Sequence, residues 1–368
     1  WVFIMMKVFL VPLIFSVFIQ TCIAESVQSL ITVSDDGTYF VQKNSGKKFI
    51  PWGFNYDHDA SGTLIENYWN SRWDEIAEDF KEMKSYGANI VRIHLQLHQF
   101  MKSAEKPNIE NFQILARLVK LAEETGIYLN ITGLACYHKD QVPEWYNETS
   151  EQQRWQLQAR FWGNIAKICN DSPAIFCYDL MNEPILPGSK KEVDWLPGEG
   201  FGGKHFVQRI SLDLAGRTKK EIALAWVNKL TAAIRKHDNK HMITVGVIPW
   251  AHTFANAKPI FYSKEVSENL DFVSVHFYPK KDQIQKALDA LAVYDIGKPL
   301  VIEEMFPLSC GIEQMDEFID KSKSIADGWI SFYWGKELDE YDKSSLADMI
   351  TKKWLEYLIK KAPEIFEN

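Results

Sequence analysis

One stretch of the chain reads Pro173-Ala-Ile-Phe-Cys-Tyr-Asp-Leu-Met-Asn-Glu-Pro184, an apolar run that stops abruptly at Asn-Glu-Pro. The apolar run predicts a buried strand. Pro184 marks the end of that strand, because proline cannot donate a hydrogen bond to a neighbouring strand. Glu183 is therefore placed at the carboxyl end of a buried strand, where barrel enzymes build their active sites. The alternative is an exposed charge at a strand–loop junction, and the rest of the chain decides between the two.

Strand-like and helix-like segments alternate on both sides of this stretch. Helical spacing of apolar residues is clear, for example, at Ile76, Phe80 and Met83. Eight such alternations in a chain of 368 residues predict a single (β/α)8 TIM barrel, an α/β fold. A doubly wound open sheet is the competing fold, but no Gly-x-Gly-x-x-Gly motif follows the first strand. The predicted strands are residues 48–56, 89–95, 127–134, 173–183, 242–248, 272–278, 299–304 and 328–334.

Two features precede the predicted barrel. Residues 1–24 are typical of a signal peptide, because Lys7 precedes an apolar run and small residues precede Glu25. A retained membrane anchor is the alternative. Removal of this segment predicts a secreted protein, free of the membrane, whose single domain spans residues 25–368. Within that domain, the alternating residues 31–42 around Asp-Asp-Gly predict an N-terminal β-hairpin that plugs the bottom of the barrel.

The composition excludes several classes of protein. The chain is 46% hydrophobic and 13% aromatic, which is a globular profile with surplus aromatic residues. A formal net charge of -8 argues against nucleic acid or an anionic membrane as partner and favours a neutral ligand bound by stacking. The four cysteines of residues 25–368 lack zinc-site spacing and are too few for a disulfide scaffold. The sequence leaves undecided whether Cys169 and Cys177 form a disulfide bond.

Two carboxylates occupy corresponding positions in this pattern. Glu183 ends the fourth predicted strand and Glu304 ends the seventh, so both should face the same barrel mouth. A pair of carboxyl groups across a cleft suits glycoside hydrolysis, in which one protonates the leaving oxygen and the other attacks the anomeric carbon. The surroundings must keep one carboxyl protonated while the other stays ionised.

The motif Tyr-Asp-Leu-Met-Asn182-Glu183-Pro184 resembles the acid/base motif of glycoside hydrolase family 5, a cellulase- and mannanase-like family in clan A of the retaining β-glycosidases. Four further marks follow the same barrel order and extend the resemblance over nearly the whole domain. They are Ile90-Val-Arg92, His276-Phe-Tyr278, Pro299-Leu-Val-Ile-Glu303-Glu304 and Trp334.

The resemblance implies a role for each matching residue. Glu183 would be the general acid/base and Glu304 the nucleophile. Arg92 and Tyr278 would hydrogen-bond the nucleophile and keep it ionised. Asn182 would bind the 2-hydroxyl of the sugar. His276 would support the acid/base or the sugar ring, and Trp334 would form the floor of the subsite where the bond breaks. No metal ion or cofactor is implied.

The adjacent Glu303 and Glu304 pose a choice. Neighbouring side chains of a strand point to opposite faces, so only one of the two is expected to enter the cleft. Matching Ile302-Glu-Glu-Met-Phe306 to the family's usual Gly-Glu-Phe-Gly places the nucleophile at Glu304. Glu303 would then have a polar supporting role.

Histidines and aromatic residues near the strand ends are further candidates. The family often carries a histidine at the end of strand three, where this chain has Ile131-Thr-Gly-Leu134. His138, in the following loop, either reaches the site or is a solvated loop residue. Trp52, Tyr56 and Trp250 lie at predicted strand ends or loops, where an aromatic ring can stack on a sugar, although each could equally be packing.

These residues together predict a secreted, retaining β-glycosidase, expected to be an endo-acting β-1,4-glucanase or β-mannanase. Its expected partner is a polysaccharide or oligosaccharide, and the protein is expected to be a monomer. Three alternatives stay open: a glycolipid-cleaving, endoglycoceramidase-like enzyme, an exo-β-glycosidase, and a sugar-binding barrel without catalysis. The sugar, the linkage and the choice between endo and exo action depend on loop shapes, which periodicity does not reveal.

Overall fold

A computed structural model of the protein describes residues 28–198, 200, 202–254, 256–342 and 344–367. The predicted signal peptide, residues 1–24, lies outside the described residues. Within the described part of the chain, no helix has the length and apolar character needed to cross a membrane.

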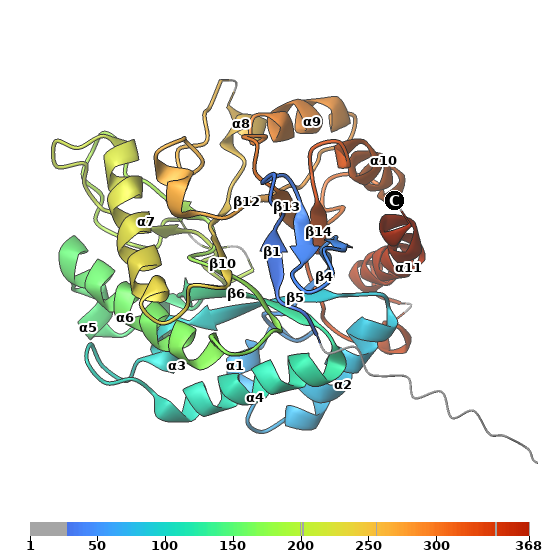
Figure 1. The fold of residues 1–368 in the computed structure, drawn as a ribbon, viewed down its shortest axis with the longest axis horizontal. Coiled ribbons are helices and arrows are strands. Elements are labelled where there is room, and N and C mark those ends of the chain that lie inside the picture. The colour runs from blue at the N-terminus through green and yellow to red at the C-terminus, as the bar shows by residue number, and fades with distance from the viewer. Residues whose placement is uncertain (1–27, 199, 201, 255, 343, 368) are drawn as a thin grey trace, which may run out of the picture.

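Parallel strands form the centre of the molecule, and helices surround them (Figure 1). The sheet runs in the order β10-β7-β6-β5-β4-β14-β13-β12-β11. Only Val245 separates β10 from β11, so the two end strands are halves of one strand and the sheet closes into an eight-stranded barrel. This confirms the predicted fold. The strands are β4 (Trp52–Asn55), β5 (Ile90–Gln96), β6 (Tyr128–Ala135), β7 (Ile175–Asp179), β10 (Met242–Thr244), β11 (Gly246–Val247), β12 (Val273–His276), β13 (Leu300–Met305) and β14 (Gly328–Ser331).

The surrounding helices follow the apolar spacing of the sequence. Capping boxes begin two of them, with Ser150 and Gln153 at α6 and Thr218 and Glu221 at α7, because these side chains satisfy free backbone N–H groups. The longer helices are α2 (Trp73–Ser85), α4 (Ile109–Thr125), α6 (Glu151–Cys169), α7 (Lys219–Arg235), α9 (Ile284–Ala292), α10 (Ile312–Ser322) and α11 (Leu346–Phe366). The short ones are α1 (Ile65–Tyr68), α3 (Leu97–Phe100), α5 (Glu144–Asn147), α8 (Trp250–Thr253), η1 (Lys139–Gln141), η2 (Val266–Asn269) and η3 (Leu338–Glu340).

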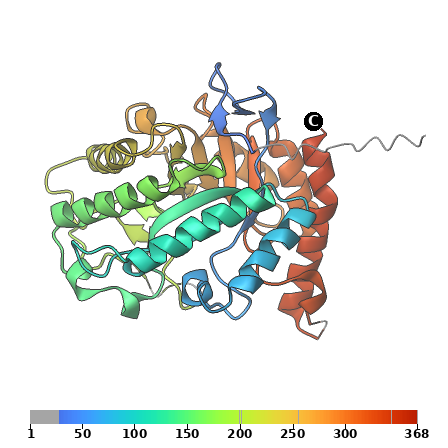
Figure 2. The same cartoon turned by 60° about the horizontal axis from the view of Figure 1, so that its bottom comes forward.

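The predicted hairpin is present and gains a third strand. β1 (Ile31–Val33), β2 (Phe40–Gln42) and β3 (Lys48–Phe49) form an antiparallel sheet at one end of the barrel (Figure 2). The Phe40 ring packs against Phe176 and Phe272, with centroids 5.1 and 5.2 Å apart, and so plugs the barrel floor. The predicted strand 48–56 is therefore two strands. They break at Ile50-Pro51, where proline has no N–H to continue either ladder.

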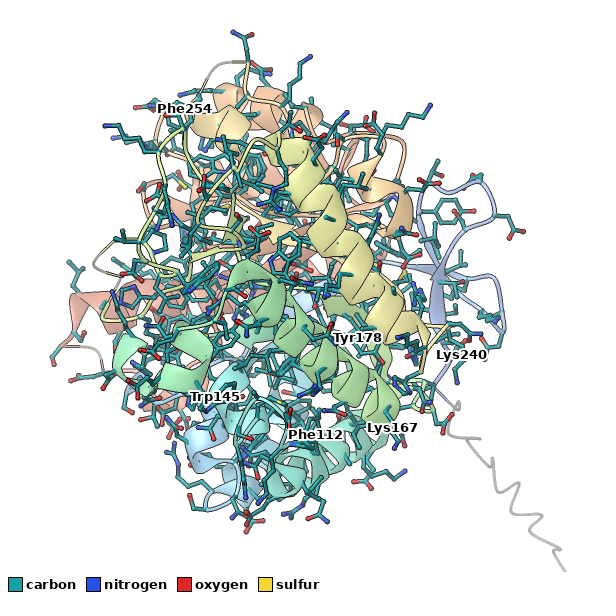
Figure 3. The ribbon with its side chains drawn as sticks, turned by 90° about the vertical axis from the view of Figure 1, so that its left-hand side faces the viewer. Phe112, Trp145, Lys167, Tyr178, Lys240 and Phe254 are labelled. Carbon is teal, nitrogen blue, oxygen red and sulfur yellow. The ribbon has the colours of Figure 1, made fainter. Side chains whose placement is uncertain are left out.

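The strands of the barrel are covered on both faces. Every residue of β5, β6 and β7 is buried, as expected for parallel strands that are covered on both faces. Cys169 and Cys177 are buried as free thiols, so the bridge between them is not formed. The barrel mouth lies opposite the N-terminal sheet; Trp145 and Phe254 are at this end in Figure 3.

Candidate active site

Glu183 lies where the chain leaves the barrel after β7. Its backbone has a φ of +46°, a left-handed conformation that is uncommon for a residue with a side chain and is often found at functional sites. Its N–H donates to the Gly246 carbonyl at 2.9 Å, which fixes the turn to the neighbouring strand. Pro184 follows at the start of β8 (Pro184–Ile185). The turn therefore places the Glu183 carboxylate at the barrel mouth.

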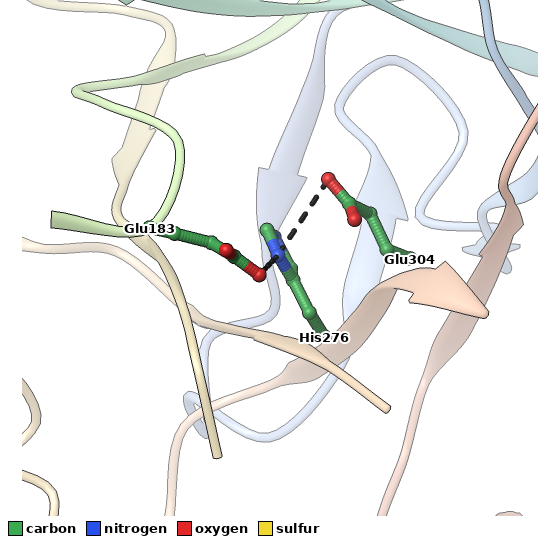
Figure 4. Close-up of side chains that lie close together, drawn as sticks. All are labelled: Glu183, His276 and Glu304. Atoms are coloured by element: carbon green, nitrogen blue, oxygen red, sulfur yellow. Dashed lines mark hydrogen bonds and ion pairs between the residues drawn. The ribbon is translucent and has the colours of Figure 1, made fainter. Parts of the chain in front are cut away.

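Glu183 and Glu304 meet there on either side of one histidine. The His276 Nδ1 atom lies 2.9 Å from Glu183 Oε1 and 3.5 Å from Glu304 Oε1 (Figure 4). One oxygen of each carboxylate and one ring nitrogen all lie within 4.8 Å of one another. Retaining glycosidases hold their two carboxyl groups about 5–5.5 Å apart, and inverting enzymes about 6.5–9.5 Å. Carboxylate oxygens that lie within 4.8 Å of each other favour the shorter class.

Two donors hold the Glu304 carboxylate in place. Arg92 Nη1 donates to Oε1 at 2.6 Å, and the Tyr278 hydroxyl donates to Oε2 at 2.7 Å. Each carboxylate oxygen thus has one donor, which fixes its orientation and favours the ionised form. The structure therefore brings Arg92, Tyr278 and Glu304 together as the sequence predicted.

Arg92 is fully buried and donates hydrogen bonds to several acceptors. Its Nη2 donates to Asp179 Oδ2 and to Asn182 Oδ1, both at 2.8 Å. Its Nε lies 3.5 Å from Glu303 Oε2. Three carboxylates, including Glu304, therefore surround one guanidinium beneath the mouth.

Glu303 and Glu304 both point into the barrel, so the expectation that they face opposite sides is wrong, although of the two only Glu304 lines the cavity, as predicted. Ile302 pairs with Trp329 and Met305 with Ser331, which leaves one extra residue in β13. Such a bulge breaks the strict alternation of side chains along a strand. Glu303 lies deeper, fully buried, and accepts a hydrogen bond from Asn130 Nδ2 at 2.6 Å. Glu304 keeps slight exposure and lines the cavity at the mouth.

Charges in this cluster shift several pKa values. Burial lowers the pKa of His276, but Glu304, Glu183 and Glu303 outweigh it and raise that pKa to about 10. Burial and the charge of Glu303 raise the pKa of Asp179 to about 6, against the effect of Arg92. For Glu303 itself, burial acts to raise the pKa, yet Arg92 and His276 bring it below its usual value. At neutral pH, His276 is therefore an imidazolium between two carboxylates.

We expect Arg92→Met to reduce the free energy of unfolding by about 3–5 kcal/mol, because it strands three carboxylates in the barrel. Lys321→Met is the control: its 2.6 Å pair with Glu317 is about half exposed, and we expect its loss to cost about 1 kcal/mol or less. Urea unfolding of both variants and the parent protein measures the difference. If Arg92→Met lowers the free energy of unfolding no more than Lys321→Met does, the carboxylate cluster does not depend on the Arg92 guanidinium.

Three predicted sugar-binding aromatic residues lie in the core instead of the cleft. Trp52 begins β4, pairs with Trp329, and is 2% exposed. Tyr56 is 1% exposed and donates its hydroxyl to Asp79. Trp334 is also 1% exposed and packs against Phe54 and Tyr86. None has a free face for a sugar, so these three predictions are wrong.

A cavity of about 500 Å³ lies beside the two carboxylates, and Trp334, which was expected to form its floor, is not among the described residues that line it. Glu183, Glu304 and Tyr278 line one polar side of it, and Lys204 and His205 also line it. β14 ends at Ser331, so the next two residues, Phe332 and Tyr333, reach the mouth and line the cavity. Neither residue was predicted to reach the site, because the strand was expected to continue to Trp334. The apolar wall also includes Phe206 and Phe306.

Neither Trp250 nor His138 is among the described residues that line this cavity. Trp250 is 42% exposed at the start of α8, where its ring stacks on Phe254 and lines a second cavity. His138 precedes η1; burial and the nearby Lys204 lower its pKa. Within the described part of the chain, no hydrogen bond or ion pair joins His138 to Glu183 or Glu304. A role for His138 in the site stays a prediction.

Among the described residues, Glu183, His276 and Glu304 have the spacing to hold a metal ion. A metal would need a free lone pair on His276 Nδ1, and a protonated imidazole offers none. The carboxylates already have cationic or hydroxyl donors in Arg92, His276 and Tyr278. The donor set therefore suits proton transfer and nucleophilic attack better than metal binding.

Comparison with known proteins gives consistent results. The family model described as Cellulase (glycosyl hydrolase family 5) matches residues 46–364. Mannan endo-1,4-beta-mannosidase 2 from Arabidopsis thaliana is 29% identical over 122 residues, which are 30% of this chain and 22% of that protein. Mannan endo-1,4-beta-mannosidase A from Emericella nidulans is 23% identical over 303 residues, which are 75% of this chain and 66% of that protein.

Solved structures share the fold. An exo-beta-1,4-mannosidase, Op5Man5 from Opitutaceae bacterium strain TAV5, has a TM-score of 0.68 at 17% identity and covers 90% of this chain and 62% of that chain. At this identity, the likeness concerns the barrel alone. The chain spans about a fifth of the length of the plant relative, 22%.

Proposed function

The chain belongs to glycosyl hydrolase family 5, and from this membership we propose that it is a retaining β-glycosidase that hydrolyses β-1,4-linked mannosides. The observation that carries the proposal is the pairing of Glu183 with Glu304, within 4.8 Å of each other and bridged by His276. The relatives that match in sequence are named mannan endo-1,4-beta-mannosidases, which supports the choice of mannose over glucose.

The geometry supports a double displacement. In the first half, a Glu304 oxygen attacks the anomeric carbon while Glu183 gives its proton to the departing glycosidic oxygen. The C–O bond breaks, the aglycone leaves, and the sugar is esterified to Glu304. In the second half, Glu183 takes a proton from water, which attacks the same carbon and releases Glu304. Two inversions give net retention of the β configuration.

The neighbouring groups have supporting roles in this proposal. Arg92 and Tyr278 keep Glu304 ionised and aimed. His276 donates to Glu183 and carries positive charge between the two carboxylates. Asn182, whose Oδ1 is held by Arg92, lies beside the pair and would contact the sugar 2-hydroxyl. This contact strengthens as the transition state forms.

We expect the protein to hydrolyse β-1,4-manno-oligosaccharides at least about tenfold faster than the matching cello-oligosaccharides, a difference of about 1–3 kcal/mol in transition-state binding. Proton NMR at early times should show the β-anomer as the first product. An α-anomer would contradict retention, and faster cleavage of the cello-series would contradict the choice of sugar. Sugar binding without hydrolysis of either series would favour a non-catalytic barrel.

One observation favours a second candidate, cleavage of glycosides with an apolar aglycone. Leu308, which lines the cavity, is 58% exposed, and Phe306 lines the cavity beside it. Apolar side chains at these places suit an alkyl or lipid aglycone better than a polysaccharide. Including an alkyl β-mannoside in the same assay tests this candidate, which fails if the alkyl group gives no advantage over an equivalent disaccharide.

We propose export on the sequence of residues 1–24 alone. Sequencing the amino terminus of protein from the medium of secreting cells checks this proposal. A mature chain beginning near Glu25 would support it, whereas full-length protein retained in membranes would favour the anchor.

A further inference from the structure

The long loop after Glu183 folds back on itself across the barrel mouth. It leaves β8 at Ile185 and returns as β9 (Gln208–Arg209), which pairs in parallel with β8. Both ends of residues 186–207 are therefore tied to the strand that carries Glu183. The last part of this loop, residues 204–208, is named here the crossing segment.

The crossing segment is fastened to loops from several strands. Gln208 Nε2 donates to the Leu134 carbonyl at the end of β6, and His205 N–H donates to the Tyr137 carbonyl just beyond it, both at 2.8 Å. The Phe206 ring contacts Tyr137 at 4.8 Å and, across the mouth, Phe332 after β14 at 6.2 Å. These anchors lie on two well-separated strands of the barrel.

Lys204, the first residue of the crossing segment, reaches the loop after β4 with its side chain. The residue is 8% exposed, and its Nζ lies 3.3 Å from the position that a Cβ atom would take on Gly62. Around the barrel, the strands between β7 and β13 on this side are β6, β5, β4 and β14. The crossing segment thus covers the half of the mouth that these strands form, between Glu183 and Glu304.

The covered half would hold the sugar to be transferred, because Asn182 contacts the crossing segment. Asn182 donates its Nδ2 to the Phe206 carbonyl at 3.0 Å, so the crossing segment reaches the residue proposed to bind the sugar 2-hydroxyl. A chain of sugars extending past this ring would run into Lys204, Phe206 and Tyr333, which wall the cavity. These side chains therefore stand in the path of a glycan that extends beyond the sugar to be transferred.

The opposite half of the mouth carries exposed aromatic side chains. The loop after β11 carries Trp250 and Phe254, which are 42% and 59% exposed and whose rings stack at 5.9 Å. Figure 3 shows Phe254 at the outer edge of this end of the molecule. An exposed aromatic pair is a surface on which the departing part of a glycan can stack.

We propose that the crossing segment makes the site a dead-end pocket for one terminal sugar, so that the protein removes single units from the non-reducing end of a β-linked oligosaccharide. This inference rests on the proposed function and gives its mode of action. It favours the exo alternative over the endo action expected from the sequence, because a polysaccharide could not lie through a cleft that the crossing segment closes on one side.

The test is a time course with β-1,4-mannohexaose labelled at its reducing end, followed by chromatography. The labelled chain should shorten by one unit at a time, with free mannose as the only unlabelled product from the earliest points. Labelled fragments two or more units shorter at those points would overturn the inference while leaving the glycosidase activity established. No hydrolysis of any β-mannoside would instead overturn the proposed function, and the inference with it.

A variant of the crossing segment tests whether this segment is what closes the cleft. Phe206→Ala removes the ring that spans Tyr137 and Phe332, and we expect it to raise the share of internal cleavage about tenfold. Val193→Ala is the control, because this side chain belongs to the same loop but is 95% exposed. An unchanged product pattern in folded Phe206→Ala would show that the crossing segment is not what closes the site.

Discussion

Replacing Glu304 by glutamine should reduce turnover of a β-mannoside by about 10⁴-fold or more, the scale seen when a catalytic nucleophile is removed. Glutamine has nearly the same shape, and its amide oxygen can still accept a hydrogen bond from Arg92 or Tyr278. An uncharged amide cannot form the glycosyl ester, so the first displacement fails. The measurement is kcat for Glu304→Gln, with circular dichroism to confirm an unchanged fold.

Glu303→Gln is the matched control, because it makes the same chemical change one residue earlier. Glu303 is fully buried and touches Arg92, Asn130 and His276, so it acts on the reaction only through these neighbours. We expect a loss of about 10–100-fold, the range typical of a supporting partner. The opposite ranking, with Glu303→Gln inactive and Glu304→Gln active, would move the nucleophile to Glu303.

Replacing Glu183 by alanine should have an effect that depends on the leaving group. With a manno-oligosaccharide, the leaving oxygen needs a proton, and we expect a loss of about 10²–10⁴-fold, the usual contribution of general acid–base catalysis. With a 2,4-dinitrophenyl β-mannoside, the leaving group departs without protonation, so formation of the glycosyl-enzyme should be nearly unaffected.

The second half-reaction of Glu183→Ala provides an independent check. Water attacks slowly without a base, so the glycosyl-enzyme should accumulate, and added azide should restore turnover because it needs no proton removed. The product should be the β-mannosyl azide, identified by NMR. Equal losses on both substrates, with no effect of azide, would contradict the role of Glu183 as acid/base.

The barrel could be predicted from the sequence because its signals are local. Each strand is a short apolar run, and each long helix has apolar residues at helical spacing, with capping boxes such as Ser150 with Gln153. The pairing of Glu183 with Glu304 followed from their place at the ends of two strands, since parallel strands bring such residues to one edge. Prediction was weaker where the chain leaves the regular elements. Pro51 divides what had been expected to be one strand into β3 and β4.

The parts that could not be predicted depend on contacts between distant residues. The bulge beside Glu303 is set by its partners in β12 and β14 and has no mark in its own sequence. The place where β14 ends decides whether Phe332 or Trp334 faces the cavity, and that end is fixed by tertiary packing. Phe206 lies in a long loop without periodicity, so its position over the mouth follows only from its contacts with Tyr137 and Phe332.

The central claim is that the reaction passes through a sugar bonded to Glu304. The most direct test uses a 2-deoxy-2-fluoro-β-mannosyl fluoride, which forms the glycosyl-enzyme readily and releases it slowly. Peptide mass spectrometry of the inactivated protein should find one fluoromannosyl group per chain, attached to Glu304. A label on Glu303, or unlabelled protein that nonetheless turns the reagent over, would contradict the account.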